Sequence, residues 1–507
     1  MSLPKLNKSL VSSSHAFPSD VNVNKPKDLP EKVLQFGEGG FLRGFVDWMI
    51  NKLNAAGEFN GRVVVVQPIP QGMVDKLNAQ DGLYTHILRG VVNGQTVEDK
   101  EIVASISRGL NPYTQFDEYM ACARNPDLRV IVSNTTEAGI VFRAEDSLTD
   151  KPPVSYPGKL TQFLFERYKA LGESKAKGFI ILPCELIERN GDNLKRCVLQ
   201  TAEHWKMPAT FIEWLKSAND WGNTLVDRIV TGYPKDEAAA IGTKLGHQDD
   251  LLNTSEPFHF WVIEASQACA KELPFDKVGL DVVFTPNMTP YRDRKVRILN
   301  GAHTMTVLAA YLAGKDTVGE CMNDDLIRDF MQRGIYDEII PTLDLPKDDL
   351  TKFAAAVTER FANPFIKHYL LSIALNSTSK FKARVLPSIK EYAKRNGGKI
   401  PQRLAFSLAA LIAFYRGTEL RDDNTLIGKR NGTEYKIQDD VAALQLMQKV
   451  WTTFKSTDTS PLVREVLASV TLWGEDLNAL PGLTDAVSKH LNAILTQGPR
   501  LALQAVA

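Results

Sequence analysis

Four short apolar runs in the first half of the chain constrain its fold more than any other feature of the sequence. They are mostly β-branched or aliphatic, and they lie at Val33–Phe36, Val63–Val66, Arg129–Ser133 and Phe179–Leu182. Such runs are typical of strands buried on both faces of a parallel sheet. Helical patterns such as Phe41–Leu53 and Lys159–Ala170 lie between them. This alternation predicts βαβ units and a doubly wound, Rossmann-type sheet.

A glycine-rich segment directly follows the first of these strands. Gly37, Gly39 and Gly40 precede a helical pattern that contains Phe41 and Arg43. In a dinucleotide-binding fold, glycines here let the chain turn sharply and approach a pyrophosphate, which binds the free N–H groups of the helix start. The third glycine of the G-x-G-x-x-G motif is a leucine, so a plain turn is the alternative. Because strand, loop and helix occur in order, we predict that these five residues bind a dinucleotide.

The residues near the other strand ends say less about the cofactor. The second strand ends in Val66-Gln67-Pro68, without the acidic residue that usually binds ribose hydroxyls and without an arginine for a 2′-phosphate. The choice between NAD and NADP is therefore open from these residues alone. Thr135 and Thr136 follow the third strand, at the edge that faces the cofactor in such folds. We predict that they contact the nicotinamide side, with helix capping as the alternative.

The two halves of the chain differ in pattern. Tyr84–Val92 and Thr96–Ser105 are predicted to form a β-hairpin around Asn93-Gly94, a favoured turn sequence, inserted in the nucleotide-binding half. From about Thr289 strand signals nearly vanish and long helical patterns dominate. The predicted fold class is α/β plus all-α. We expect a flexible N-terminal arm at 1–27, a Rossmann-type dinucleotide-binding domain at 28–287, and a mostly helical substrate and catalytic domain at 288–507.

Composition narrows the class of partner. The 507 residues carry 60 basic and 60 acidic side chains, and a net charge of zero argues against a nucleic acid or a membrane surface as a general partner. The five cysteines are scattered without a C-x-x-C pair, which indicates reduced thiols and predicts no metal site. We find neither a signal peptide nor an apolar run long enough to span a bilayer. We expect a cytoplasmic protein that acts on a small molecule, with an oligomeric state that the sequence does not determine.

Three polar residues suited to ketone reduction lie at the start of the helical half. Around an α-helix, Asn300 lies about 140° and His303 about 80° from Lys295, so all three can face one cleft. Lysine can transfer a proton, asparagine can stabilise a developing alkoxide, and histidine can bond a hydroxyl. Burial and the adjacent Arg294 and Arg297 would lower the pKa of the lysine. An ordinary helix with a surface lysine is the alternative that these residues leave open.

The sequence also resembles a known family. Lys-x-x-x-x-Asn-x-x-His, preceded by a G-x-G-G-F-x-R loop, is similar to the polyol-specific long-chain dehydrogenases, which include mannitol 2-dehydrogenase and the hexuronate reductases. The resemblance covers nearly the whole chain from about Lys32, and further matching segments are Gln80–Thr85, Asn223–Ile229, Glu256–Phe258 and Arg360–Pro364. It implies a Rossmann-type domain, a helical C-terminal domain, a cleft between them, and zinc-independent hydride transfer with NAD.

The resemblance also implies roles for single residues. Lys295 becomes the general acid/base, Asn300 and His303 bind the reacting hydroxyl or carbonyl, and Asn223 and Asp227 line the substrate cleft. One departure from the family concerns the substrate. Mannitol dehydrogenases commonly have Ser-Cys-Asp-Asn where this chain has Pro183–Leu186, and leucine cannot replace the hydrogen bonds of that asparagine. This difference argues against mannitol as the substrate.

Three segments most resemble the branch of the family that reduces tagaturonate to altronate. They are Gln35–Gly44, Leu182–Gly191 and Lys295–Gly314. The implied function is reversible, NAD-dependent reduction of tagaturonate in hexuronate catabolism. The alternatives are fructuronate or mannitol as the substrate, an NAD-dependent sugar-acid epimerase, and a nucleotide-sensing module that has no use for Lys295.

A uronate substrate carries a carboxylate and calls for a cation. Lys380, Lys382 and Arg384 alternate along the chain and would share one side of an extended segment. Lys382 best matches a basic position of the family, and His368 is a second candidate. The alternative is a solvated basic loop.

Overall fold

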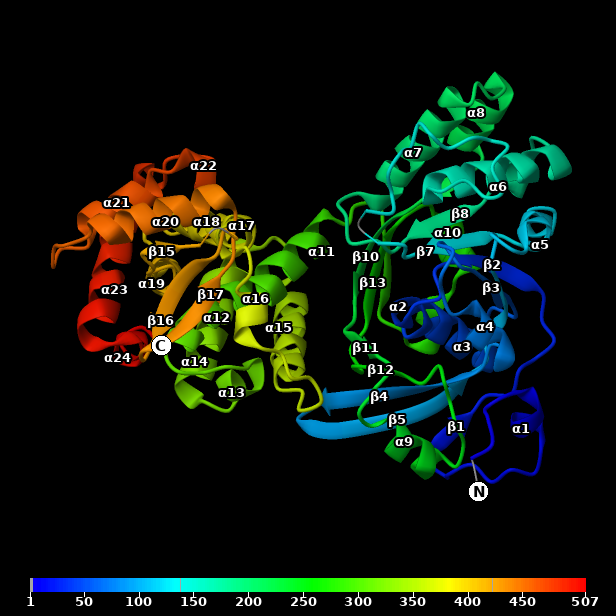
Figure 1. Ribbon diagram of the computed structural model, residues 1–507, viewed down its shortest axis with the longest axis horizontal. Helices are drawn as coiled ribbons and strands as arrows, with labels where there is room; N and C mark the ends of the chain where they lie inside the picture. The colour runs from blue at the N-terminus through cyan, green and yellow to red at the C-terminus, as the bar shows by residue number, and fades with distance from the viewer. Residues whose placement is uncertain (1–2, 137, 422) are drawn as a thin grey trace. The chain divides into compact units, whose positions relative to one another are not determined.

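The computed structural model describes residues 3–136, 138–421 and 423–507. The chain forms two compact units, Met1–Met288 and Thr289–Ala507 (Figure 1). Each unit buries its own large set of apolar side chains.

A six-stranded parallel sheet forms the centre of the first unit. Its strands are β2 (Glu31–Phe36), β3 (Arg62–Val66), β6 (Ile106–Leu110), β7 (Val130–Ser133), β8 (Ile180–Pro183) and β9 (Asp220–Trp221). They lie in the order β6-β3-β2-β7-β8-β9, and all neighbours are parallel. The direction of winding reverses between β2 and β7, which is the switch point where ligands bind beyond the carboxyl ends of the strands. The predicted doubly wound sheet is confirmed.

Alternate residues of the central strands enter two separate cores, one on each face of this sheet. Val63 and Val65 pack in the core that contains α3 (Val46–Ala56), and Val64 and Val66 pack in the core that contains α6 (Tyr156–Leu171). Burial on both faces explains why the run has no polar position. The other helices of the unit are α1 (Lys8–Ser12), α2 (Gly40–Arg43), α4 (Val74–Ala79), α5 (Phe116–Cys122), α7 (Asn190–His204), α8 (Ala209–Ser217), α9 (Ala238–Leu245) and α10 (Gln267–Glu272).

A second sheet contains the predicted hairpin. β4 (Tyr84–Val92) and β5 (Gln95–Val103) pair antiparallel around Asn93 and Gly94, whose φ angles are 51° and 74°. Positive φ at both turn residues is the geometry that Asn-Gly favours. The sheet also contains β1 (Val21–Val23), β11 (Val230–Gly232) and β12 (Asn253–Ser255), in the order β1-β5-β4-β12-β11. The predicted hairpin is confirmed.

The N-terminal segment differs from the flexible arm that we expected at residues 1–27. Within its described part, α1 is capped by the Asn7 side chain, and β1 pairs in parallel with β5. Leu6, Val11 and Val21 are buried in a core that also contains Leu83. These apolar side chains lie far apart in a polar segment, so the sequence pattern does not reveal the packed face.

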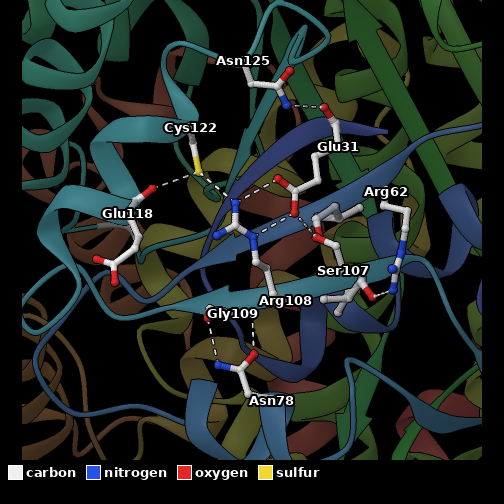
Figure 2. Close-up of polar contacts among 11 residues, drawn as sticks. Glu31, Arg62, Asn78, Ser107, Arg108, Gly109, Glu118, Cys122 and Asn125 are labelled. Carbon is white, nitrogen blue, oxygen red and sulfur yellow. Dashed lines mark hydrogen bonds and ion pairs between the residues drawn. The ribbon is translucent and has the colours of Figure 1, made fainter. Parts of the chain in front are cut away.

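A polar cluster fixes the edge of the parallel sheet (Figure 2). Arg108 of β6 donates to both carboxylate oxygens of Glu31 in β2, at 2.9 and 3.0 Å, and lies 3.6 Å from the sulfur of Cys122. Asn78 of α4 exchanges two hydrogen bonds with the backbone of Gly109. Burial raises the pKa of the Cys122 thiol to about 11, so this thiol is neutral. The cluster therefore holds β6 against its neighbours.

A third sheet of the first unit contains the segment predicted to line the substrate cleft. β10 (Asn223–Asp227) pairs antiparallel with β13 (Phe260–Glu264), which pairs in parallel with β14 (Val282–Thr285). Asn223 and Asp227 are the first and last residues of β10, and both are buried.

The second unit is mostly helical. Residues 404–414 of α19 (Gln402–Phe414) are all buried, and α12 (Gly301–Leu312) and α23 (Leu483–Gln497) pack against this helix. The other helices are α11 (Thr289–Arg294), α13 (Val318–Met322), α14 (Asp325–Arg333), α15 (Lys347–Phe361), α16 (Leu370–Ile373), α17 (Ser377–Arg384), α18 (Leu386–Arg395), α20 (Val441–Thr453), α21 (Ser460–Leu467), α22 (Val470–Trp473) and α24 (Pro499–Gln504). Lys295–Asn300 and Gly334–Ile339 are π-helical.

One sheet of this unit was not predicted. β15 (Glu419–Leu420), β16 (Leu426–Arg430) and β17 (Thr433–Ile437) form an antiparallel sheet. Asn431 and Gly432 join β16 to β17 with φ angles of 51° and 84°. This turn repeats the Asn-Gly signal of the first hairpin, from which the sheet could have been predicted.

Within the described ranges, no helix is both long and apolar enough to cross a membrane. The same residues contain no group of three or more His, Cys, Asp or Glu side chains that could hold a metal ion. All five cysteines are buried and free.

Candidate active site

The glycine loop begins at the carboxyl end of β2, beside the ends of β3 and β7. Gly37 has a φ of +119°, and a Cβ atom there would lie 3.1 Å from the carbonyl oxygen of Asn134. Its N–H donates to the carbonyl of Val66 at 3.0 Å. Both the backbone conformation and the close approach require glycine. By contrast, a Cβ atom at Gly39 would meet no atom within 4 Å, so the space in front of this residue is open.

Side chains from the protein interior hold the carbonyl groups of this loop. The pairs are Gln35 with Gly37 (3.0 Å), Arg43 with Glu38 (3.2 Å), Asn253 with Gly40 (2.9 Å), Tyr84 with Arg43 (2.6 Å) and Arg228 with Gly44 (2.9 Å), with the donor named first. The first N–H groups of α2 have no acceptor within the helix, as in any helix. The loop thus directs its acceptors inward and keeps donors for a ligand. These residues fit a dinucleotide pyrophosphate.

Two of the five residues of the glycine loop that we predicted to bind the cofactor have side chains that contact the protein. Arg43 is buried, and its guanidinium also donates to the carbonyl of Leu251 at 2.5 Å. Phe41 stacks on Phe45, with ring centroids 5.2 Å apart. Both side chains therefore contact the protein, and a direct contact of either with the cofactor stays a prediction.

The predicted nicotinamide-side residues lie at the end of β7. The N–H and Oγ1 of Thr135 donate to one carboxylate oxygen of Glu185, at 2.9 and 3.0 Å, and Ser133 donates to the other at 3.0 Å. Burial raises the pKa of Glu185, and these hydrogen bonds oppose the rise. Thr136 is exposed. Glu185 therefore fixes the position of Thr135, and the roles of both threonines toward the cofactor stay predictions.

The predicted proton-transfer residues lie on one helical segment of the second unit. Lys295–Asn300 form a π-helix between α11 and α12. The i→i+5 bonding of a π-helix brings Lys295 and Asn300 about one turn apart, so they share a side more closely than the α-helical angle predicts. Asn300 and His303 are three residues apart and are neighbours on the helix surface. Single π-helical turns are frequent at functional sites.

His303 lies among aromatic and basic side chains. Its ring centroid is 4.0 Å from that of Phe361 and 5.4 Å from that of His368. Burial, reinforced by nearby positive groups, lowers the pKa of His303 to about 3. The imidazole is therefore neutral at physiological pH, and it can accept one hydrogen bond and donate another. The basic neighbours that contribute are His368, Arg360, Arg384 and Lys380, of which the two arginines and the lysine are the cations.

The basic segment is helical, so the prediction that its three cations share one side is wrong. Lys380, Lys382 and Arg384 lie in α17. Residues four apart share a helix face, which places Lys380 with Arg384 and leaves Lys382 on another side. Nη1 of Arg384 is 3.5 Å from the hydroxyl of Thr304 in α12, whereas Lys382 reaches toward Gly474. Lys380 and Arg384 are thus the residues of this segment near His303.

The arginines beside Lys295 contact side chains of other helices of the second unit. Arg297 donates to the hydroxyls of Ser388 at 2.6 Å and Thr342 at 2.9 Å. The guanidinium of Arg294 lies 4.4 Å from the ring centroid of Phe353. A lowered pKa of Lys295 caused by these arginines stays a prediction.

Asn223 is bonded within the first unit. Its Oδ1 accepts from the N–H of Asp192 at 3.1 Å, and its Nδ2 donates to Glu264 at 3.3 Å. Contacts of Asn223 and Asp227 with a substrate stay predictions.

Two family descriptions match the chain. "Mannitol dehydrogenase Rossmann domain" matches residues 31–277, and "Mannitol dehydrogenase C-terminal domain" matches residues 287–495. The chain belongs to the mannitol dehydrogenase family. The resemblance to polyol-specific dehydrogenases is thereby confirmed, and the glycine loop and the Lys–Asn–His segment lie within the two matched domains of this family.

Relatives within the mannitol dehydrogenase family match along almost their whole length. Altronate oxidoreductases of Enterobacter sp. (strain 638) and of Shigella flexneri are each 49% identical to this chain over 478 residues, 94% of this chain and 96% of theirs. The solved ternary complex of Pseudomonas fluorescens mannitol 2-dehydrogenase with NAD and D-mannitol is 22% identical, with a TM-score of 0.69 and 99% of each chain covered. A substrate-free D-sorbitol dehydrogenase is 20% identical, with a TM-score of 0.81, covering 98% of this chain and 100% of its own. These two structures share the fold of this chain.

Several residues of the site were missed from the sequence. Asn253 holds the glycine loop from 213 positions away along the chain, and no local pattern marks it. Arg228, Glu38 and Arg360 did have a signal, because each lies inside a segment that resembles the family.

Proposed function

We propose that this protein is an NAD-dependent altronate oxidoreductase, which interconverts tagaturonate and altronate. The observation that carries the proposal is the 49% identity with altronate oxidoreductases across 94% of the chain. Membership of the mannitol dehydrogenase family agrees with the predicted dehydrogenase that acts on a CH–OH group.

The first unit would hold the cofactor. Gly37, Gly39 and Gly40 would let the pyrophosphate approach the backbone, and the N–H groups at the start of α2 would bind it. NAD is also the cofactor in the mannitol 2-dehydrogenase complex that shares this fold. When bound, the reduced cofactor supplies the hydride for the carbonyl carbon of the substrate.

The second unit would handle the proton. Nζ of Lys295 gives a proton to the carbonyl oxygen during reduction and takes it back during oxidation. The amide of Asn300 donates to the same oxygen as negative charge develops on it. His303 is neutral because of its burial and its basic neighbours, so it can donate to the reacting oxygen or to an adjacent hydroxyl without competing for the proton.

The substrate carboxylate would bind the basic side of α17. Lys380 and Arg384 both contribute to the positive surroundings of His303. A guanidinium can bind a carboxylate through two parallel hydrogen bonds, which suits Arg384 for this role. Lys382, the residue that we favoured from the sequence, lies on another side of the helix. A polyol without a carboxylate would gain nothing from these two cations.

The test is the oxidation of NADH, with tagaturonate, fructuronate and fructose offered in parallel. We expect fast oxidation with tagaturonate, slow oxidation with fructuronate, and almost none with fructose. A preference for fructose would contradict the role of the basic face of α17. An absence of reaction with every ketone, in protein that binds NADH, would contradict the proposed activity and favour an epimerase or a binding module.

A further inference from the structure

The end of β3 lacks the acidic residue with which most NAD sites bind the adenosine ribose. Gln67 stands there instead, and its side chain is used within its own turn. Its Nε2 donates to the carbonyls of Ile69 and Pro70, both at 2.9 Å, and its Oε1 is 3.5 Å from the N–H of Val74. Gln67 is also buried. The group that would accept hydrogen bonds from ribose hydroxyls must therefore come from another segment.

Glu38 of the glycine loop extends to this turn. A Cβ atom at Gly72 would lie 2.3 Å from the Oε1 atom of Glu38 and equally close to Gln67, so the carboxylate lies directly against the turn after β3. The backbone N–H groups of Met73 and of Glu38 itself lie near this carboxylate and lower its pKa. Burial nevertheless raises the pKa of Glu38 above its usual value. The side chain is partly exposed, so a ligand can reach it.

The placement of Glu38 matches the position of the ribose in this fold. In a Rossmann-type sheet the pyrophosphate lies at the loop after the first strand, and the adenosine ribose lies at the carboxyl end of the second, here β3. A carboxylate has about four acceptor positions, so it can accept hydrogen bonds from two hydroxyl groups and still have neighbouring N–H groups beside it. One side chain thus connects the phosphate loop with the ribose position.

The surroundings of Glu38 disfavour a phosphorylated ribose. A 2′-phosphate would place about two negative charges against the carboxylate. The guanidinium of Arg43 cannot readily compensate, because it is buried and donates to the carbonyls of Glu38 and Leu251. We propose that Glu38 binds the adenosine ribose hydroxyls and makes the protein select NAD over NADP. This inference rests on the proposed function, because it assumes that a nicotinamide dinucleotide binds at the glycine loop.

The experiment measures the dissociation constants of NADH and NADPH by calorimetry, without substrate, for the full chain and for Glu38→Gln and Glu38→Ala. A hydrogen bond to a charged group contributes about 1.5–3 kcal/mol, so each variant should bind NADH at least about tenfold more weakly. Loss of the negative charge should leave NADPH binding unchanged or tighter. The ratio of the dissociation constant of NADPH to that of NADH should therefore fall by about tenfold or more. Glu203→Gln, on an exposed side of α7, is the matched control and should change neither constant.

The outcomes separate this inference from the function on which it rests. If the unaltered chain bound neither NADH nor NADPH, the proposed function would fail. If it bound NADH and both Glu38 variants kept its selectivity, the role of Glu38 would be refuted while the cofactor site stood. Equal weakening of both dinucleotides would also refute it, because that result describes a loop support and not a ribose ligand. Denaturation midpoints, measured for all variants, would check that each variant keeps the fold.

Discussion

The reaction proposed here depends on one residue more than on any other. Lys295 lies at the start of a π-helical turn that brings Asn300 to its side, and His303 follows on the same helix surface. The neutral state of His303 matters for this arrangement, because a second cation would compete with the lysine for the role of proton donor. The low pKa of His303 follows from burial first and from its basic neighbours second.

Replacing Lys295 tests this arrangement directly. Lys295→Met keeps the length of the side chain and removes its proton, so kcat should fall about 10²–10⁴-fold, the usual contribution of a general acid. The dissociation constant of NADH should not change, because the glycine loop belongs to the other unit. Lys352→Met, an exposed lysine of α15, is the control and should retain full activity. Loss of NADH binding in Lys295→Met would indicate a structural role instead.

A second prediction at this scale concerns Asp47, which accepts a hydrogen bond from Gln35, the same residue that holds the carbonyl of Gly37 in the glycine loop. This carboxyl group is fully buried and accepts a hydrogen bond from Gln35 at 3.0 Å, and burial raises its pKa to about 7. The folded protein therefore binds this proton more tightly than the unfolded chain. The resulting stability is complete below about pH 4 and is lost as the pH rises through about 7.

Asp47→Asn removes this dependence while keeping the shape of the side chain. The free energy of unfolding of Asp47→Asn, relative to that of the unaltered protein, should rise by on the order of 2 kcal/mol between pH 5 and pH 8. Urea denaturation at several pH values measures it. The control is Asp75→Asn, an exposed aspartate in the first turn of α4, which should show almost no such growth. A pH-independent difference for Asp47→Asn would mean that Asp47 stays ionised in the folded protein.

At the scale of elements, the sequence predicted those strands whose surroundings are uniform. The run Val63–Val66 is apolar at every position because two cores bury it, and that condition is visible in the sequence itself. β16 is buried only at its first three residues, β17 alternates between buried and exposed residues after its first position, and both are of mixed composition, so only their Asn-Gly turn marks them. Alternating basic residues suggested an extended segment at 380–384, but these residues lie within an eight-residue helix. The segment is too short, and too uniformly polar, to show the apolar periodicity that would have predicted a helix.

The helical form of α17 leads to a prediction about substrate affinity. Arg384→Ala and Lys380→Ala should each raise the KM for tagaturonate by about tenfold or more, since each would remove a charged partner of the carboxylate. Lys382→Ala belongs to the same helix but points elsewhere, so it is the matched control and should leave KM nearly unchanged. If Lys382→Ala alone raised the KM, Lys382 would be the carboxylate partner, and Lys380 and Arg384 would not be.

At the scale of the whole molecule, the residues proposed for cofactor binding and those proposed for proton transfer belong to different units. The glycine loop and its supporting side chains belong to residues 1–288, and the Lys–Asn–His segment belongs to residues 289–507. Each unit has its own core, so each can unfold as a cooperative body. A ligand that binds one folded unit stabilises that unit by RT ln(1 + [L]/Kd).

This division predicts the calorimetric behaviour of the full chain. At an NADH concentration of about 100 times Kd, the stabilisation is about 2.7 kcal/mol, and it should appear in the transition of the first unit. The transition of the second unit should move much less with NADH alone. Hydrogen exchange assigns the transitions to the two units. The peptides that span 33–44 and 66–73 should gain protection when NADH binds, and they should lose it in the transition that NADH shifts. A shift of equal size in both transitions would contradict this prediction, because it would show that the two units unfold as one body.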